Sequence, residues 1–269
     1  MEINNLIFLH IPKAGGTTLN SILGNQYGRS NRIYINGIED GIDKAKKTKV
    51  KSFNKTLVFT GHMAFGLHEY LPGNSKYITY LRSPVDRVIS LYQYILQNSK
   101  HPLHKKLIEE KITLQLFVAG EFDRDTENSQ TKLLAGIKAS ENKKNLLQIA
   151  LENINNHFVH IGILEMFDES LILIARRLKW SKYVYLKQNV TNKNYNNAID
   201  DNIINIIQEK NKLDSDLYKI FKNKLIDECK LEGQSFYNDL KYFQKYNKLY
   251  QAIMHYPYMI LQKIRFFNR

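Results

Sequence analysis

Residues 6–19 read Leu6-Ile7-Phe8-Leu9-His10-Ile11-Pro12-Lys13-Ala14-Gly15-Gly16-Thr17-Thr18-Leu19, and the architecture can be inferred outward from them. The apolar run up to Ile11 lacks helical spacing and ends at Pro12 and two glycines, which is typical of a buried parallel strand. Apolar residues at helical spacing follow, and Gly24 is expected to end that helix. A strand, a glycine turn and a helix are therefore predicted in direct succession.

The rest of the chain repeats this alternation. Further buried strands are predicted at residues 56–60, 76–81, 158–163 and 183–186. Helical periodicity fills much of the second half, at residues 103–139, 142–156, 168–178 and 199–229, with a polar loop at 120–128. Strands alternating with helices predict a three-layer α/β/α, P-loop-like fold with a parallel central sheet and a helix-rich second half. No Pro-rich or Ser-rich linker divides the chain, so residues 1–269 are predicted to form a single domain.

Composition limits the kinds of partner and compartment. Thirty-nine Lys and Arg against 26 Asp and Glu leave a formal charge of +13, which attracts anions such as nucleotides, acidic glycans, nucleic acid and anionic lipid. Cys229 is the only cysteine, so no internal disulfide can form and a reducing, cytoplasmic location is expected. The apolar run near the N-terminus is too short for a signal peptide or a membrane span.

The segment from Lys241 to Arg269 is basic and aromatic. It holds six Lys and Arg residues, no acidic residue, and interleaved Tyr and Phe. A terminal helix that packs its aromatic residues on the core is the favoured interpretation. Peripheral contact with an anionic membrane, at its inner face, is the alternative.

The turn from Pro12 to Thr18 has the chemistry of a phosphate-binding loop. The start of a helix offers free N–H groups and the positive end of the helix dipole. The two glycines allow an anion to approach the backbone closely, the two threonines add hydroxyl donors, and Lys13 adds a positive charge. The motif is not a Walker A loop, because its lysine precedes the glycines, and no strand ends in an obvious magnesium-binding Asp. Metal-independent transfer is therefore expected. The alternative to phosphate binding is a strand-to-helix turn in which the glycines only allow the chain to bend.

A second group of residues lies further along the chain. Residues 77–84, Tyr-Ile-Thr-Tyr-Leu-Arg-Ser-Pro, predict a strand that runs into a helix. Arg82 falls at the carboxyl end of that strand, the edge at which open α/β sheets bind ligands, and Ser90 lies in the helix. The two could hold a further phosphate. Alternatively, Arg82 forms a surface ion pair with Asp86 and Ser90 is a neutral helical residue.

Together the two motifs resemble the donor-binding signatures of the sulfotransferase family that includes the heparan sulfate O-sulfotransferases. The segments that carry the resemblance are residues 11–18 and 81–90, in matching order and spacing. The resemblance implies that Lys13, Ala14, Gly15, Gly16, Thr17 and Thr18 hold the 5′-phosphosulfate of 3′-phosphoadenylyl sulfate (PAPS). It implies that Arg82 and Ser90 hold its 3′-phosphate.

The similarity covers most of residues 6 to 220. It continues through the segments 61–66, 128–136, 162–167, 189–191 and 213–218. Lys132 stands where the family pattern usually has Arg, and Ser83 stands where it often has Asp. These departures affect local contacts and leave the class unchanged.

Sulfuryl transfer needs a base for the acceptor hydroxyl and a cation for the leaving phosphate. Lys13 is the predicted cation. His62 follows a predicted strand and is the candidate base, a role that the family match also implies; a histidine that merely packs is the alternative. His68 and Glu69 are substitutes. Two further groups are candidates, and for each residue an ordinary position on the solvated surface is an equal alternative. Gln130 and Lys132 could face the donor or the acceptor. A loop that closes over the nucleotide could contain Lys187, Asn189 and Thr191, of which Asn189 is counted among the donor-binding residues.

The predicted activity is transfer of the sulfuryl group from PAPS to an acceptor hydroxyl, and family analogy favours a carbohydrate. A phosphotransferase that uses ATP and magnesium is the first rival, supported by the generic phosphate loop. A basic protein that binds membrane or nucleic acid without catalysis is the second, supported by the charge of +13, although specific nucleic-acid recognition is not expected.

Overall fold

The protein contains a parallel five-stranded sheet in the order β2-β3-β1-β4-β5. The computed structural model describes residues 2–48, 56–120, 122, 124–136, 139, 145–181, 183–187 and 199–267, with side chains as far as Met254. The strands are β1 (Asn5–Leu9), β2 (Arg32–Asn36), β3 (Leu57–His62), β4 (Ser75–Leu81) and β5 (Phe158–Ile163). The predicted α/β class with a parallel central sheet is therefore confirmed.

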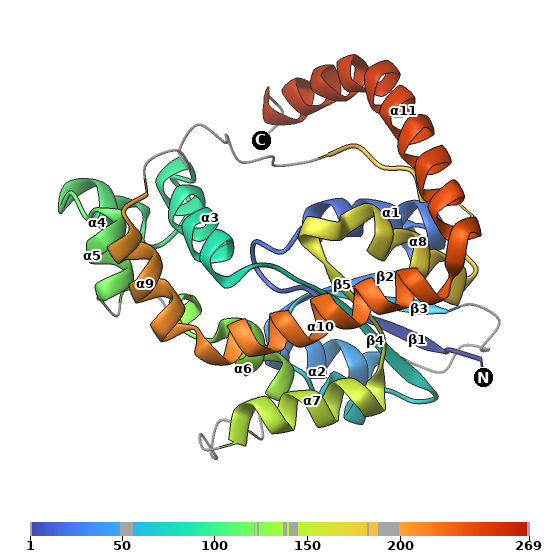
Figure 1. The fold of residues 1–269 in the computed structure, drawn as a ribbon, viewed down its shortest axis with the longest axis horizontal. Coiled ribbons are helices and arrows are strands. Elements are labelled where there is room, and N and C mark those ends of the chain that lie inside the picture. Colours follow the sequence, from blue (N-terminus) through green and yellow to red (C-terminus); the bar gives the residue numbers. More distant parts are fainter. Residues whose placement is uncertain are drawn as a thin grey trace.

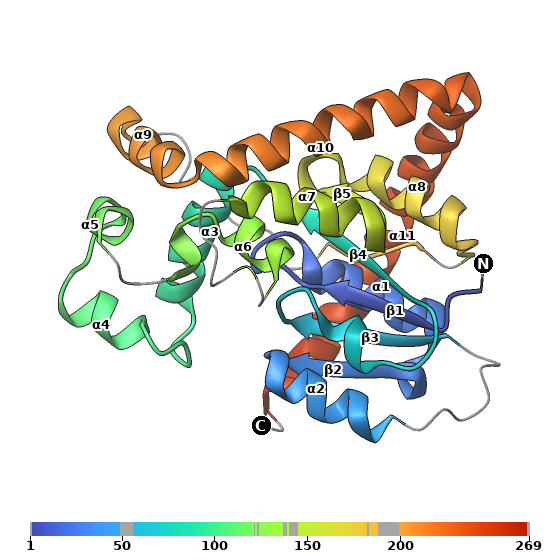
Figure 2. The same ribbon diagram turned by 90° about the horizontal axis from the view of Figure 1, so that it is seen from below.

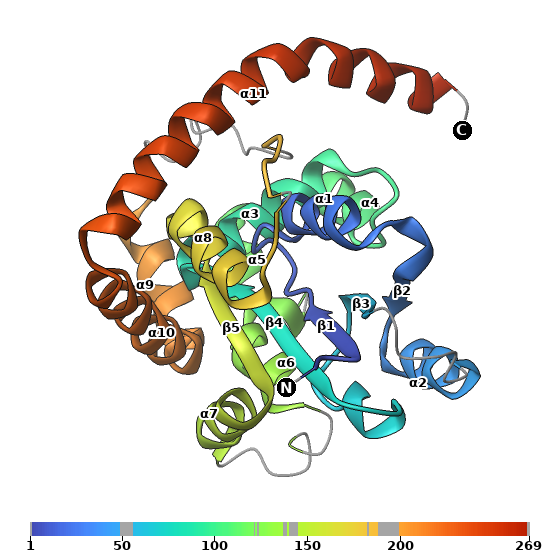
Figure 3. The ribbon, with the colours of Figure 1, turned by 90° about the vertical axis from the view of Figure 1, so that its right-hand side faces the viewer.

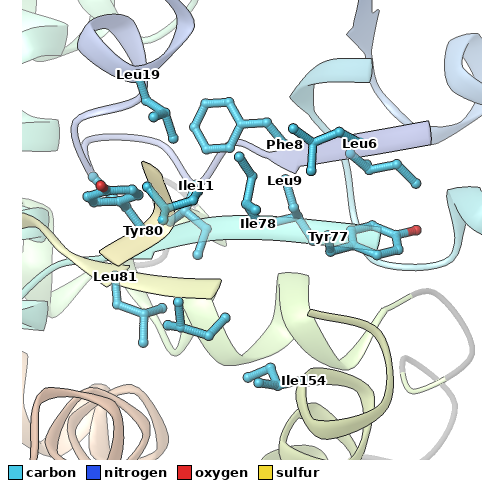
Figure 4. Packing of buried hydrophobic residues seen from close by; sticks show 14 of the residues in the cluster. Leu6, Phe8, Leu9, Ile11, Leu19, Tyr77, Ile78, Tyr80, Leu81 and Ile154 are labelled. Atoms are coloured by element: carbon cyan, nitrogen blue, oxygen red, sulfur yellow. The ribbon is translucent and has the colours of Figure 1, made fainter. Parts of the chain in front are cut away.

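Helices cover both faces of this sheet. Figure 3 shows α1 (Gly16–Tyr27) and α8 (Phe167–Leu178) on one face, and α6 (Ser129–Ala135) and α7 (Leu146–His157) on the other. All five residues of β1 are buried, as expected for a strand enclosed on both sides. In Figure 4, Leu19 of α1 and Ile154 of α7 approach the sheet from opposite sides. Each such buried side chain contributes about 1.5–3 kcal/mol to folding.

A group of helices extends from the carboxyl ends of the strands. It comprises α3 (Pro84–Gln97), α4 (His104–Glu109), α5 (Leu114–Ala119) and α9 (Asp201–Lys210), on the left in Figure 1. Two small apolar clusters hold these helices together, one around Phe117 and one around Val88 and Ile207. The long helix α10 (Lys212–Leu231) runs from this group along the sheet and contacts β5 (Figure 2). The remaining helix before β3 is α2 (Ile38–Lys47), which packs beside β2.

One predicted strand was wrong, and one strand of the sheet was missed. β2 was not predicted, because its sequence Arg32-Ile33-Tyr34-Ile35-Asn36 is short and mixes polar with apolar residues at the sheet edge. Residues 183–186 were predicted as a strand but lie outside the sheet. The backbone N–H of Tyr185 donates instead to the side chain of Asn247, 2.9 Å away. The apolar residues of segment 183–186 are therefore covered by the C-terminal helix that carries Asn247, and not by neighbouring strands.

Two helix boundaries also differ from the prediction. Gly24 lies inside α1, which ends at Tyr27, directly before Gly28. A Cβ at Gly24 would lie 2.4 Å from Arg32 Nη1, so a glycine here leaves room for the Arg32 side chain. The helical region 103–139 is divided into α4, α5 and α6, with a short 3-10 turn at Arg124–Thr126 between α5 and α6. Thr113 begins α5 by accepting a hydrogen bond from the N–H of Leu116.

The C-terminal segment continues a single helix, α11 (Gly233–Phe267). Phe243 and Asn247 are buried against the rest of the protein, which agrees with the favoured interpretation for this part. Figures 1 and 3 show the helix passing α8 and continuing beyond it. Within the described part of the chain, no helix has the length and hydropathy needed to cross a membrane.

Candidate active site

The loop after β1 has the backbone that a phosphate-binding turn requires. Lys13 and Gly15 adopt left-handed conformations, with φ of 66° and 80°, and α1 begins directly afterwards at Gly16. A Cβ on Gly16 would lie 1.8 Å from Nε2 of His10, so only glycine fits beneath that ring. The first N–H groups of any helix have no acceptor within it, and the first turn of α1 lines a cleft.

Three adjacent strands bring the predicted residues to one edge of the sheet. β3, β1 and β4 are neighbours: β3 ends at His62, the glycine loop follows β1, and Arg82 directly follows β4. The Nη1 group of Arg82 donates to the carbonyl oxygen of Lys13, 3.0 Å away. The structure therefore brings Lys13 and Arg82, which are 69 positions apart in the sequence, into one site.

These residues line a cleft of about 990 Å³. Helix α3 contributes Asp86, Ser90, Gln93 and Tyr94, which recur at the spacing of one helix face. Ser90 is among them and is buried. Acidic and aromatic side chains from other elements complete the wall, including Asp125, Glu165, Phe167, Asp168, Glu169 and Tyr185.

Lys13 lies in a setting that disfavours its charge. Its Nζ is 4.2 Å from the centroid of the Tyr94 ring, a cation–π contact. Burial, and then the nearby positive charge of Arg82, lower the pKa of Lys13 to about 8. An anion bound between the two cations would stabilise the charged form of Lys13 and so offset both effects.

His62 is held by His10 in a defined orientation. The two rings stack with centroids 4.3 Å apart, and His62 Nδ1 lies 3.1 Å from the carbonyl oxygen of His10. A carbonyl only accepts, so neutral His62 carries its proton on Nδ1 and leaves the lone pair of Nε2 available. Desolvation lowers the pKa of His62 below its usual 6.5, although the His10 carbonyl and the charge of Asp125 act in the opposite direction.

His10 and Tyr94 are site residues that the sequence analysis missed. Burial, together with the charges of His62 and Lys13, lowers the pKa of His10 to about 3, so the ring is neutral at physiological pH. His10 directly precedes the Ile11-Pro12 step into the loop, and Tyr94 lies four residues after Ser90 on the same helix face. Both positions could have been inferred from this spacing.

The other predicted donor residues have different placements. Ala14 lies in the core at 2% exposure and its N–H donates to the carbonyl of Ile11, so it anchors the loop from below. Thr17 and Thr18 line the cleft, as does Lys187. Asn189 and Thr191 lie outside the described residues.

Gln130 and Lys132 do not lie at the cleft wall. Gln130 is fully buried, accepts from the N–H of Arg82 at 3.0 Å and donates to its carbonyl at 2.9 Å, so it positions Arg82. Lys132 is exposed, with Nζ 3.8 Å from Glu127. Glu165 does line the cleft and accepts from the N–H of Ser83 at 2.9 Å.

The substitutes for the base, His68 and Glu69, are not among the residues that line the cleft. His68 contacts the hydroxyl of Tyr77, and its ring centroid lies 4.3 Å from that of His157 in a tilted arrangement. Among the described residues, no group of three or more His, Cys, Asp or Glu side chains is arranged to hold a metal ion.

Comparison with known proteins identifies the family. The family model described as galactose-3-O-sulfotransferase matches residues 2–239, which include every strand, the glycine loop, His62 and Arg82. The chain belongs to the galactose-3-O-sulfotransferase family. The match of this family model ends within α11, so residues 240–269 lie beyond it.

No curated protein sequence matches this galactose-3-O-sulfotransferase family member. Among solved structures, a crystal structure of mouse sulfotransferase SULT7A1 complexed with PAP matches at 17% identity and a TM-score of 0.41. The match covers 78% of this chain and 65% of the mouse chain.

Proposed function

We propose that this member of the galactose-3-O-sulfotransferase family transfers a sulfuryl group from PAPS to a carbohydrate hydroxyl. The observation that carries the proposal is the convergence of His62, the glycine loop and Arg82 from three adjacent strands on one cleft. Each has a chemical property that the reaction needs: a neutral imidazole, a helix start without side-chain obstruction, and fixed positive charge.

The cleft suits a donor with two separated phosphate groups. Gly15 and Gly16 allow the 5′-phosphosulfate to approach the first turn of α1, with Lys13 beside it. Ser90 and Arg82 offer a hydroxyl and a guanidinium for the 3′-phosphate. One Arg82 N–H group is already used by the Lys13 carbonyl, and a guanidinium has five, so the others are sufficient.

The transfer is an in-line displacement at sulfur. The acceptor oxygen forms a bond to sulfur while the bond between sulfur and the bridging phosphate oxygen breaks, and adenosine 3′,5′-bisphosphate leaves. His62 Nε2 takes the hydroxyl proton, and the bond from Nδ1 to the His10 carbonyl stabilises the resulting imidazolium. Lys13 and the loop neutralise the charge that develops on the departing phosphate.

A sugar acceptor is supported by the other walls of the cleft. Tyr94, Phe167 and Tyr185 offer ring faces, while Asp86 and Gln93 offer hydrogen-bonding groups for hydroxyls. Aromatic faces with a few directed polar groups are typical of pockets for small polar ligands. We also infer a cytoplasmic location, which is supported by the presence of a single cysteine.

A thermal-shift titration tests donor binding. Adenosine 3′,5′-bisphosphate at 100 times its dissociation constant should stabilise the protein by about 2.7 kcal/mol, without added magnesium. ATP with magnesium serves as the comparison, and stabilisation by ATP-magnesium alone would establish a kinase instead. Transfer of label from PAPS to galactose-terminated oligosaccharides then tests the acceptor, and labelling of other hydroxyl compounds alone would refute the carbohydrate assignment.

A further inference from the structure

Helix α11 presents an apolar stripe to solvent. Tyr242, Tyr246, Leu249 and Ile253 follow one another at intervals of four, three and four residues, and their exposures are 74%, 52%, 58% and 62%. That spacing places all four on one side of the helix. The side that faces the protein is different and consists of Phe236, Phe243 and Asn247, exposed by 0%, 5% and 3%. The stripe is therefore not needed for packing α11 onto the fold.

Positive charge accompanies this stripe. Lys241, Lys245 and Lys248 are exposed on α11, and the sequence holds no Asp or Glu from Leu240 to the end of the chain. Some lysines on other helices have a carboxylate partner one turn away, such as Lys44 with Asp40 at 2.7 Å. The stripe and its lysines lie beyond residue 239, where the match to the family model ends. They are thus additional to the part of the chain shared with the family.

The helix is firmly attached at its first turns. Arg176 of α8 forms an ion pair with Asp239 of α11 at 2.5 Å, and a second one with Glu232, the residue that connects α10 to α11. Gln244 donates to Asp168 at 3.3 Å, and both residues line the donor cleft. The inner side of α11 therefore contributes to the catalytic body, while its outer side remains open.

We propose that the outer face of α11, the stripe Tyr242-Tyr246-Leu249-Ile253 with its flanking lysines, docks on an anionic membrane surface. A helix with Tyr and aliphatic residues on one face and lysines beside them lies in the headgroup region, where rings and aliphatic chains enter the interface and lysines meet lipid phosphates. A second copy of the chain fits less well. Pairing two such stripes would bring lysine rows of the same sign together without any carboxylate between them.

Vesicle co-sedimentation of the full chain tests this docking. The protein should sediment with vesicles of phosphatidylcholine and phosphatidylglycerol, remain in solution with phosphatidylcholine alone, and dissociate as salt is raised. Replacing all three lysines, K241E/K245E/K248E, should lower the partition coefficient at least about tenfold. The variant L249Q/I253Q should lower the partition coefficient as well, because it loses apolar contact with the membrane. Its charge is unchanged, so the loss can be assigned to that contact.

The matched control carries the same change of charge elsewhere. Lys46, Lys47 and Lys219 are exposed on α2 and α10, so K46E/K47E/K219E should bind vesicles as the unmodified chain does. Circular dichroism melting should confirm that each variant is folded. Equal loss in the control, or no binding to anionic vesicles by the unmodified chain, would overturn the proposal. Light scattering that shows a dimer dispersed by L249Q/I253Q would instead assign the stripe to a second copy.

Discussion

The Arg82 guanidinium donates from Nη1 to the backbone carbonyl of Lys13, across 3.0 Å. This bond joins the loop that follows β1 to the residue that follows β4. The two strands are paired in the sheet, although Lys13 and Arg82 are 69 positions apart in the sequence. Arg82 is itself held at its backbone by the buried side chain of Gln130. The loop conformation and the proposed contact with the 3′-phosphate are therefore linked through one side chain.

Replacing Arg82 should weaken donor binding. R82A removes the proposed charged hydrogen bonds to the 3′-phosphate and the bond to the Lys13 carbonyl, so we expect the affinity for adenosine 3′,5′-bisphosphate to fall about tenfold to a hundredfold. Isothermal titration measures the loss. Arg29 is exposed outside the cleft, and R29A should leave the affinity unchanged. An unaltered affinity in R82A would remove Arg82 from the donor site.

His62 should affect turnover more than binding. H62N removes the proton acceptor and should lower kcat about 10²- to 10⁴-fold, while the thermal shift by adenosine 3′,5′-bisphosphate stays close to that of the unmodified enzyme. His68, which contacts Tyr77, provides the comparison. H68Q should retain most of the activity. If H68Q is the inactive variant instead, the base has been assigned to the wrong histidine.

The rate should depend on pH in both directions. His62 must be neutral to accept a proton, and its pKa is held below 6.5, so kcat/KM should fall only as the pH drops below that value. Lys13 must be charged, and its pKa in the free enzyme is about 8, so kcat/KM should fall again above about pH 8. The variant K13R keeps its charge at higher pH. A pH–rate profile of K13R should lack the alkaline limb, and persistence of that limb would show that another group causes it.

The variant G16A tests the packing of the loop beneath the His10 ring. The added Cβ of G16A would lie 1.8 Å from His10 Nε2, so the ring must leave its stack on His62. We expect about 1–3 kcal/mol of lost stability and reduced kcat, measured by urea unfolding and initial rates. The double variant G16A/H10A restores the space. Its stability should recover relative to G16A, and purely additive losses would mean that the ring is not the obstruction.

Asp214 should be required for stability. Its buried carboxylate on α10 accepts from the N–H groups of Gln130 and Thr131, at 3.1 and 2.7 Å, and from the Thr131 hydroxyl at 2.8 Å. D214A leaves these donors without an acceptor and should lower the free energy of unfolding by about 1–3 kcal/mol. Asp216 is exposed on the same helix, and chemical denaturation of D216A should show a change within about 0.5 kcal/mol. Equal stability of the two variants would contradict this role.

Much of the fold could be predicted because the local spacing of apolar residues indicates which side chains are buried. The strand-loop-helix succession at residues 6–19 and Pro84 at the start of α3 were predicted from the chain alone, and the structure confirms them. β2 was missed because an edge strand of five residues, with Tyr34 exposed by 53%, has no continuous apolar run. The extended segment at 183–186 has such a run, but a helix from the end of the chain buries it.

The sequence by itself determined the α/β class, the glycine loop and the identities of Lys13, His62 and Arg82 as candidates, since apolar spacing and loop composition are local properties of the chain. Only the tertiary structure decided that these residues share a cleft, that the His10 carbonyl sets the tautomer of His62, and that Gln130 supports Arg82 from within the core. Those relationships depend on strand order and on contacts between residues about 50 to 70 positions apart. No local pattern encodes such distances, because they arise only when the sheet has assembled.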